Sequence, residues 1–231
     1  MRPVPTALAV SLAMFALAGT ARTAFAQTAA PAPAPVVTPV GTDTVEEDWA
    51  IVVNTPNPTE GAPQFATFMS PVTDQSASYA LLRLNGYDQP VYNVGGIQSQ
   101  IWTGDSKTCL ASSPTTVAPA TNQLATANET ISWTQRLQYN VAKGQITFAV
   151  VNATTATWGN FSIGSGLGKL HFTAPATGVM GYSSTVSMKN SGVTYGANYV
   201  TSMTLKQVRY YSGSRLLATD STPKPVSLTV N

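Results

Sequence analysis

The stretch that decides the fold is residues 131–150, which read ISWTQRLQYNVAKGQITFAV. Apolar residues occupy alternate positions in both halves: Ile131, Trp133, Leu137, Tyr139 and Val141, then Ile146, Phe148 and Val150. A period of two residues is typical of a strand with one buried and one solvated face. The short run Ala142-Lys143-Gly144 separates the halves. We therefore predict an antiparallel hairpin with Gly144 at positive φ.

Strand-like segments also surround this hairpin. They are separated by Gly, Pro and Asn and cover residues 49–53, 64–69, 80–84, 97–102, 107–111, 169–173, 184–188, 199–211 and 215–219. In the long segment 199–211 the apolar phase changes near Lys206 and Gln207, which predicts a β-bulge there. No segment shows a helical period.

About ten antiparallel strands predict an all-β fold with two sheets packed face to face. The length favours a jelly-roll, concanavalin-like sandwich, because an immunoglobulin-like sandwich needs only about 100 residues. Cys109 is the single cysteine, so no intramolecular disulfide can form. We expect Cys109 to be a small buried hydrophobe.

The N-terminus reads as an export signal. Arg2 precedes an apolar run at 7–19, and Ala24-Phe25-Ala26 forms a cleavage site. This predicts a signal peptide at 1–26, a Pro/Ala-rich linker at 27–44 and a single β-sandwich domain at 45–231. The protein is then exported to the periplasm, the cell surface or the medium. An apolar run of about thirteen residues is too short to span a bilayer, which needs about twenty.

Charge argues against a nucleic-acid partner. Charged residues make up 10% of the chain, and the twelve Lys and Arg include Arg2 and Arg22 of the signal, which leaves ten against ten acids. Phosphate backbones are bound by clustered Lys and Arg. Membrane-spanning and nucleic-acid-binding classes are therefore not expected.

Residues for catalysis are scarce. His171 is the only histidine, and strand alternation places it opposite Leu170 and Phe172. We assign no catalytic residue and no cofactor. Metal binding stays open at four loop residues that we expect to make turn hydrogen bonds instead: Asp74, Asp88, Asn93 and Asp105.

The acids Glu46, Glu47 and Asp48 precede Trp49. We expect them to be solvated at the start of the first strand. The alternative is a divergent glycosidase or polysaccharide lyase, which needs two suitably spaced carboxylates and would use Glu46, Asp48 and a distant acid such as Glu129.

Glycan binding is the function that the remaining residues favour. Sugars bind to exposed aromatic rings with amide and hydroxyl groups nearby. The candidate ligand-binding residues are Trp102, Trp158, Tyr87 and Tyr92. We expect a secreted, non-catalytic module with a binding or structural role, and a self-assembling envelope protein is a further alternative.

Several short blocks resemble a group of exported bacterial proteins with no assigned function. The blocks are Glu46-Glu47-Asp48-Trp49 with Asn54-Thr55-Pro56, Met69-Ser70-Pro71, Trp158-Gly159-Asn160-Phe161, and Gly196-Ala197-Asn198-Tyr199-Val200 leading to Val208-Arg209-Tyr210. The resemblance implies a lectin-like β-sandwich over most of the mature chain. It implies no site residues.

Overall fold

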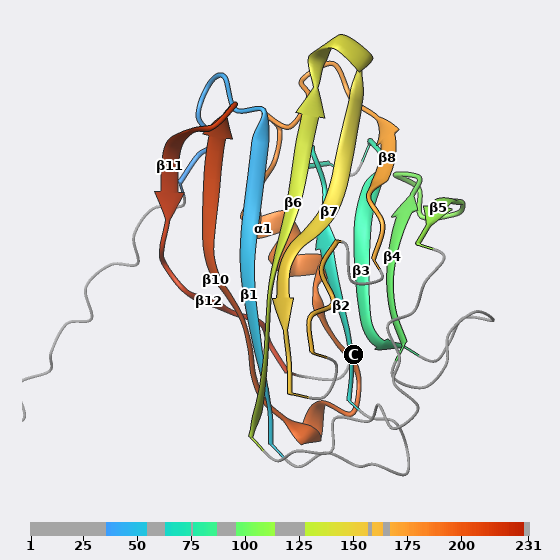
Figure 1. The fold of residues 1–231 in the computed structure, drawn as a ribbon, viewed down its shortest axis with the longest axis vertical. Helices are drawn as coiled ribbons and strands as arrows, with labels where there is room; N and C mark the ends of the chain where they lie inside the picture. The colour runs from blue at the N-terminus through green and yellow to red at the C-terminus, as the bar shows by residue number, and fades with distance from the viewer. Residues whose placement is uncertain are drawn as a thin grey trace, which may run out of the picture. The chain divides into compact units, whose positions relative to one another are not determined.

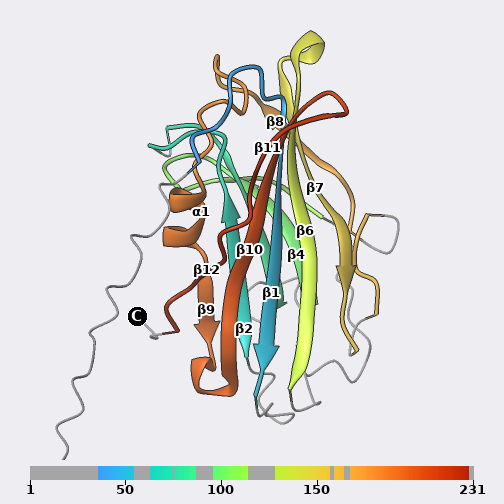
Figure 2. The ribbon, with the colours of Figure 1, turned by 90° about the vertical axis from the view of Figure 1, so that its left-hand side faces the viewer.

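Two antiparallel sheets face each other in the computed structural model of the chain (Figures 1 and 2). The structure describes residues 36–54, 63–74, 76–86, 96–113, 128–156, 159–163 and 167–228. The predicted all-β, two-sheet antiparallel sandwich is confirmed.

The larger sheet has seven strands. Its order is β11 (Arg215–Asp220), β10 (Val200–Ser212), β1 (Thr44–Val53), β6 (Glu129–Asn140), β7 (Gln145–Thr154) and β8 (Leu170–Thr173), with β12 (Lys224–Pro225) also paired to β10. The first strand of the domain therefore lies inside the sheet, between β10 and β6. Figure 1 shows this sheet in front, with β1 near its middle.

The smaller sheet has five strands. Its order is β5 (Cys109–Ser112), β4 (Gly96–Trp102), β3 (Tyr79–Gly86), β2 (Gln64–Met69) and β9 (Gly192–Tyr195). Because β5 is an edge strand, Cys109 is exposed, and the expectation that it is buried is wrong.

One predicted strand is a helix. Residues 184–188 belong to α1 (Ser184–Asn190), which contacts β2 (Figure 2). Its buried residues, Ser184 and Ser187, are three positions apart and so lie on one helical face. The strand prediction was wrong because polar and apolar residues alternate in this segment, a pattern that is typical of a strand. Two short 3₁₀ helices complete the elements, η1 (Val141–Lys143) and η2 (Ala197–Tyr199).

The core lies between the sheets and draws apolar side chains from both. The larger sheet contributes Val45, Trp49, Ile51, Ile131, Trp133, Leu137, Ile146, Phe148, Val150, Met203, Leu205, Val208 and Tyr210, and the smaller one Phe65, Met69, Ala80, Leu82, Leu84, Ile97 and Ile101. Trp49 and Trp133 are cross-strand neighbours, and their rings stack with centroids 6.0 Å apart.

The hairpin of 131–150 is confirmed as β6 and β7. η1 makes the turn, with Asn140 Oδ1 accepting from Lys143 N at 3.1 Å and Gly144 at φ 58°. Val141 was expected on the buried face but is 73% exposed, because β6 ends at Asn140 and Val141 belongs to the turn.

The bulge near Lys206 is confirmed. Asp48 pairs with Gln207 and Trp49 with Leu205, so Lys206 has no partner of its own on β1. A second shift lies across the sheet, where Thr134 pairs with Asn152 but Gln135 with Val150. Each shift adds one residue to the outer face of its strand.

Residues before β1 also pack on the sandwich. Val36 lies against the core, and Thr38 Oγ1 donates to the carbonyl of Tyr182 at 2.7 Å.

Substitution of Gly144 tests the hairpin turn. A Cβ at this position would meet no atom within 4 Å, so the cost of Gly144→Val is conformational strain at positive φ rather than a clash. We expect a loss of about 1–2 kcal/mol in the free energy of unfolding. Lys143→Ala, on the exposed turn, should change it little. Thermal melts of both variants measure this, and equal melting temperatures would contradict the turn geometry.

Trp133 should matter more for stability than Trp102. Trp133 is 2% exposed and stacks on Trp49 in the core, whereas Trp102 is only partly buried. Trp133→Ala should leave a cavity that costs about 3–5 kcal/mol, and Trp102→Ala should cost less. Denaturant midpoints decide this. An equal or larger loss for Trp102→Ala would show that the facing of β6 is wrong.

Candidate functional site

The three consecutive acids of β1 point to opposite faces of the larger sheet. Glu47 shares the core face with Val45 and Trp49, while Glu46 and Asp48 lie on the outer face. Glu47 is fully buried and Glu46 is 6% exposed. The expectation of a solvated acidic cluster is therefore wrong, because β1 begins at Thr44 and pairs on both sides along the whole acidic run.

On the outer face the two acids bind arginines from both neighbouring strands. Glu46 pairs with Arg136 of β6, and Arg209 of β10 lies 3.1 Å from Glu46 and 2.7 Å from Asp48. The cross-strand register dictates these contacts, because Arg136 and Arg209 are both opposite Glu46. Two arginines on the strands that flank β1 thus neutralise two carboxylates of β1.

Asp48 has further partners that hold it in place. It accepts hydrogen bonds from Thr134 Oγ1 at 2.6 Å and from Gln207 Nε2 at 2.5 Å. With 23% of its side chain exposed, it still faces solvent beside these groups. An acid held by a cation and two neutral donors is fixed in orientation.

On the core face Glu47 is buried, and no described Lys, Arg or His side chain pairs with it. Its carboxylate accepts from Trp49 Nε1 at 2.8 Å, from Gln135 Nε2 at 2.7 Å and from the Tyr182 hydroxyl. Gln135 in turn accepts from Thr67 Oγ1 of β2 at 2.8 Å. The network therefore joins the two sheets through the core.

Burial raises the pKa of Glu47 above its ordinary value. Hydrogen bonding opposes this, and the buried Ser187 hydroxyl has the largest opposing influence although its Oγ makes no hydrogen bond of ordinary geometry. Burial and the nearby Glu47 charge also raise the pKa of Tyr182, so its hydroxyl stays protonated and donates.

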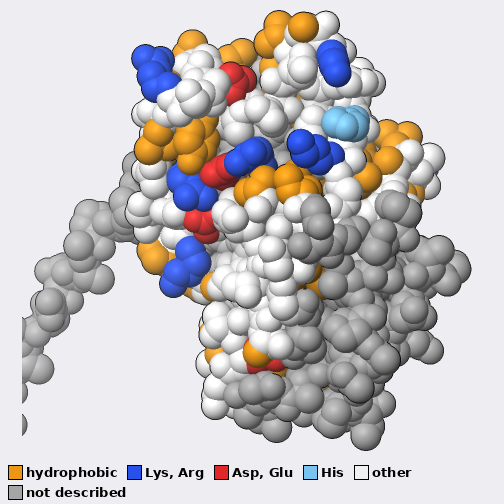
Figure 3. Space-filling model, viewed as in Figure 1, with side chains coloured by type: hydrophobic (Ala, Val, Ile, Leu, Met, Phe, Trp, Pro, Cys, Tyr) orange, Lys and Arg blue, Asp and Glu red, His pale blue; other side chains and the backbone are white. Residues whose placement is uncertain are grey.

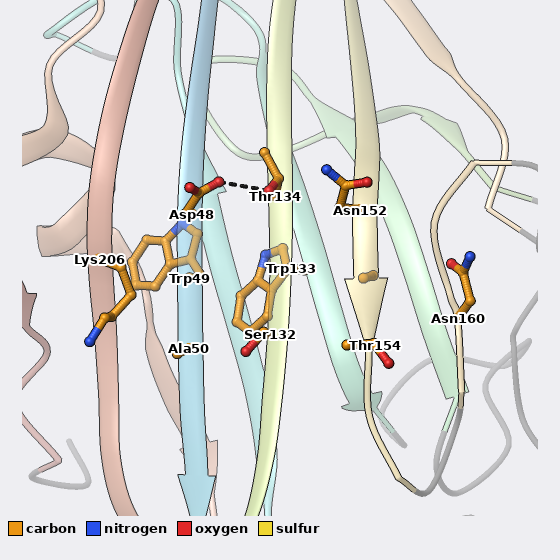
Figure 4. A pocket seen from close by; sticks show the side chains of 11 residues that line it. Asp48, Trp49, Ala50, Ser132, Trp133, Thr134, Asn152, Thr154, Asn160 and Lys206 are labelled. Atoms are coloured by element: carbon orange, nitrogen blue, oxygen red, sulfur yellow. Dashed lines mark hydrogen bonds between the residues drawn. The ribbon is translucent and has the colours of Figure 1, made fainter. Parts of the chain in front are cut away.

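A pocket of about 540 Å³ opens on the outer face, next to Asp48 (Figure 4). It spans β10, β1, β6 and β7 and is lined by Asp48, Trp49, Ala50, Ser132, Trp133, Thr134, Asn152, Ala153, Thr154, Asn160 and Lys206. Five lining residues carry hydroxyl or amide groups, namely Ser132, Thr134, Asn152, Thr154 and Asn160, while the larger part of the wall is apolar.

Both bulges lie beside this pocket. Lys206 is the extra residue of β10, and Asn152 follows the shift in β7. Each bulge turns an additional side chain to the outer face at the row of Asp48 and Thr134. The irregular ladder is thus what widens the polar lining across four strands.

A second pocket of about 360 Å³ adjoins the first and shares Asn152 with it. It is lined by Thr44, Glu46, Arg136, Gln138, Asn152, Arg209, Tyr211, Gly213 and Ser214. Figure 3 shows that most charged side chains of this face gather towards the end where the β6–β7 turn lies.

Of the candidate ligand-binding residues, Trp102 lies on the other sheet. Its Nε1 donates to Gln100 Oε1 at 3.0 Å, on the face of β4 opposite the core residues Ile97 and Ile101. It contributes nothing to either pocket described above. Tyr87, Tyr92 and Trp158 lie outside the described residues.

The acids proposed for catalysis are not brought together. Glu129 is buried and shares the core-facing side of β6 with Ile131, whereas Glu46 and Asp48 lie on the outer face. His171 is exposed opposite Leu170 and Phe172, as predicted, and its Nδ1 lies 3.0 Å from Thr147 Oγ1.

Metal ligands do not gather within the part of the chain that the structure describes, where no three His, Cys, Asp or Glu side chains form a group. Asp74 and Asp105 make the predicted turn hydrogen bonds, to Ser76 N at 3.0 Å and Lys107 N at 3.1 Å. Asp88 and Asn93 lie outside the described residues. No described helix is long and apolar enough to cross a bilayer.

Comparison with known proteins adds no relative: no family model matches the chain, and no curated protein matches its sequence. The resemblance to exported bacterial proteins stays a prediction.

The buried Glu47 should make stability depend on pH. A raised pKa means that the folded protein keeps a proton that the unfolded chain releases, so the contribution of Glu47 to stability falls as the pH rises from the ordinary value of 4.5 through the raised one. The uncharged, isosteric Glu47→Gln lacks this loss. We therefore expect wild type to lose stability relative to Glu47→Gln as the pH rises, measured by urea unfolding.

Asp220 provides a control of opposite sign. Burial alone would raise the pKa of Asp220, but hydrogen bonds from Lys224 and Thr222 lower it overall. The advantage of wild type over Asp220→Asn should therefore shrink as the pH falls from the ordinary value of 3.8 through the lowered pKa. A difference between wild type and Glu47→Gln that does not vary with pH would contradict the raised pKa.

Proposed function

We propose that the protein is an exported, non-catalytic module that binds glycans on the outer face of its larger sheet. The pocket beside Asp48 carries the proposal. Its volume of about 540 Å³ falls within the range of about 300–1,000 Å³ that small-molecule sites occupy. Hydroxyl and amide groups, which pair with sugar hydroxyls, line it on four strands and a loop.

Other features of the chain support this function. The export signal predicted at 1–26 and the low charge of the sequence suit a protein that works outside the cytoplasm. We further propose that the sandwich is of the jelly-roll, concanavalin-like kind, since its size and its two sheets of unequal width suit that class.

The acids proposed for a glycosidase are not arranged for that reaction. Glu46 and Asp48 are neighbours on one strand, and both are paired with arginines. Glu129 lies on the opposite face of the sheet. A glycosidase needs its two carboxyl groups across the scissile bond from each other, which this set does not provide.

Asn152→Ala tests the site. Asn152 is exposed and lines both pockets, so its loss should remove sugar contacts with little effect on folding. We expect affinity for the best ligand on a glycan array to fall about tenfold, roughly 1.4 kcal/mol, in calorimetry. Asn198→Ala, an exposed Asn of η2 outside both pockets, is the matched control and should bind as wild type does.

Trp102→Ala tests which of the two sheets carries the binding site. If binding is lost in this variant but kept in Asn152→Ala, the site lies on the smaller sheet instead. If no glycan binds the wild-type protein, the proposed function is wrong.

A further inference from the structure

The pocket on the larger sheet contains a cation that none of the described acidic residues neutralises. Lys206 is exposed and lines the pocket. Within the described ranges it has no ion-pair or hydrogen-bond partner, whereas Asp48 is already held by Arg209, Gln207 and Thr134. The ammonium group of Lys206 is therefore solvated by water and accessible to a ligand.

The bulge is the reason for this placement. In a regular ladder, one residue of β10 would oppose Asp48, and its neighbours would point to the core. With the bulge, both Lys206 and Gln207 are turned away from the buried Leu205 and Val208. Gln207 takes the bond to Asp48, so Lys206 is free to reach past it.

The charged residues that line the two adjoining pockets also favour an anionic ligand. Their linings contain three cations, Lys206, Arg136 and Arg209, against two carboxylates, Glu46 and Asp48. Arg136 also keeps 35% of its side chain exposed. The surplus is one positive charge beside hydroxyl and amide groups.

We propose that the ligand of this site is an acidic polysaccharide, whose sugar carries a carboxylate or a sulfate ester that pairs with Lys206. This inference rests on the proposed glycan-binding function and names its ligand class. Figure 4 shows Lys206 on one side of the pocket and Asn160 on the other, with Ser132 and Thr154 between them. β10 and β7 are three strand spacings of about 4.8 Å apart, so a stretch of two or three sugar residues is needed to place an anion at Lys206 and hydroxyls on the amide side.

A neutral sugar fits less well for an electrostatic reason. Its hydroxyl groups can accept hydrogen bonds from the ammonium group in place of water, but they bring no opposite charge, so this exchange gains little free energy. An anionic sugar replaces that water with a charge-assisted hydrogen bond. The exposed setting also makes the interaction sensitive to salt.

The experiment compares three polymers by calorimetry at low and high salt: polygalacturonate, dextran sulfate and neutral dextran. We expect one acidic polymer to bind best and its affinity to fall with salt. The acidic polymer that binds better identifies the anion as carboxylate or sulfate. Lys206→Gln should lower the affinity about tenfold and flatten the salt dependence, while Lys206→Arg should retain most of it.

Lys143→Gln is the control, because Lys143 is also exposed but lies on the turn of the β6–β7 hairpin. Equal losses in Lys143→Gln and Lys206→Gln would mean diffuse attraction and would overturn the inference. Tighter binding of neutral dextran would also overturn it, yet leave the proposed function standing. If the protein binds none of the three polymers and no glycan on the array, both the inference and the proposed function are wrong. Thermal melts of each variant confirm that it is folded.

Discussion

The carboxylate of Glu47 imposes the constraint on which the rest of the structure depends. A buried acid without a cation must be surrounded by donors, and these come from β1, from β6 and from the segment before α1. Through Gln135 the same network reaches Thr67 on the opposite sheet. Because each strand alternates, fixing Glu47 inwards also fixes Glu46 and Asp48 outwards, where the arginines and the pocket lie.

The outer face obtains its shape from departures from regular pairing. A regular sheet of this width would present a uniform array of side chains, one for every second residue of each strand. Here the shifts in β10 and β7 add residues at the row of Asp48. The polar part of the pocket lining therefore arises from ladder geometry and short polar side chains.

The sequence predicted the strands correctly where apolar and polar residues alternate strictly. It failed for the short helix α1 and for the three adjacent acids of β1. The β6–β7 hairpin and the bulge at Lys206 followed from apolar phase alone. α1 was taken for a strand because seven residues are too few to show a helical period. The acids of β1 were placed in solvent because three adjacent charges rarely lie inside a sheet, and their partners, such as Arg209, are distant in the chain.

The pocket was missed for a related reason. The apolar positions of these strands were predicted to face the core. Ser132 and Thr134, which line the pocket, were predicted only to face solvent. Which polar positions meet across four strands depends on strand order, and neither composition nor spacing reveals that β1 lies between β6 and β10.

That strand order also governs how the chain folds. Asp48 and Arg209 are 161 positions apart and yet meet in the middle of the larger sheet. Until β10 is available, β1 has an open edge, and the sheet lacks one of its two longest ladders. Such distant contacts make folding slow. The larger sheet can therefore be completed only after nearly the whole chain has been synthesised.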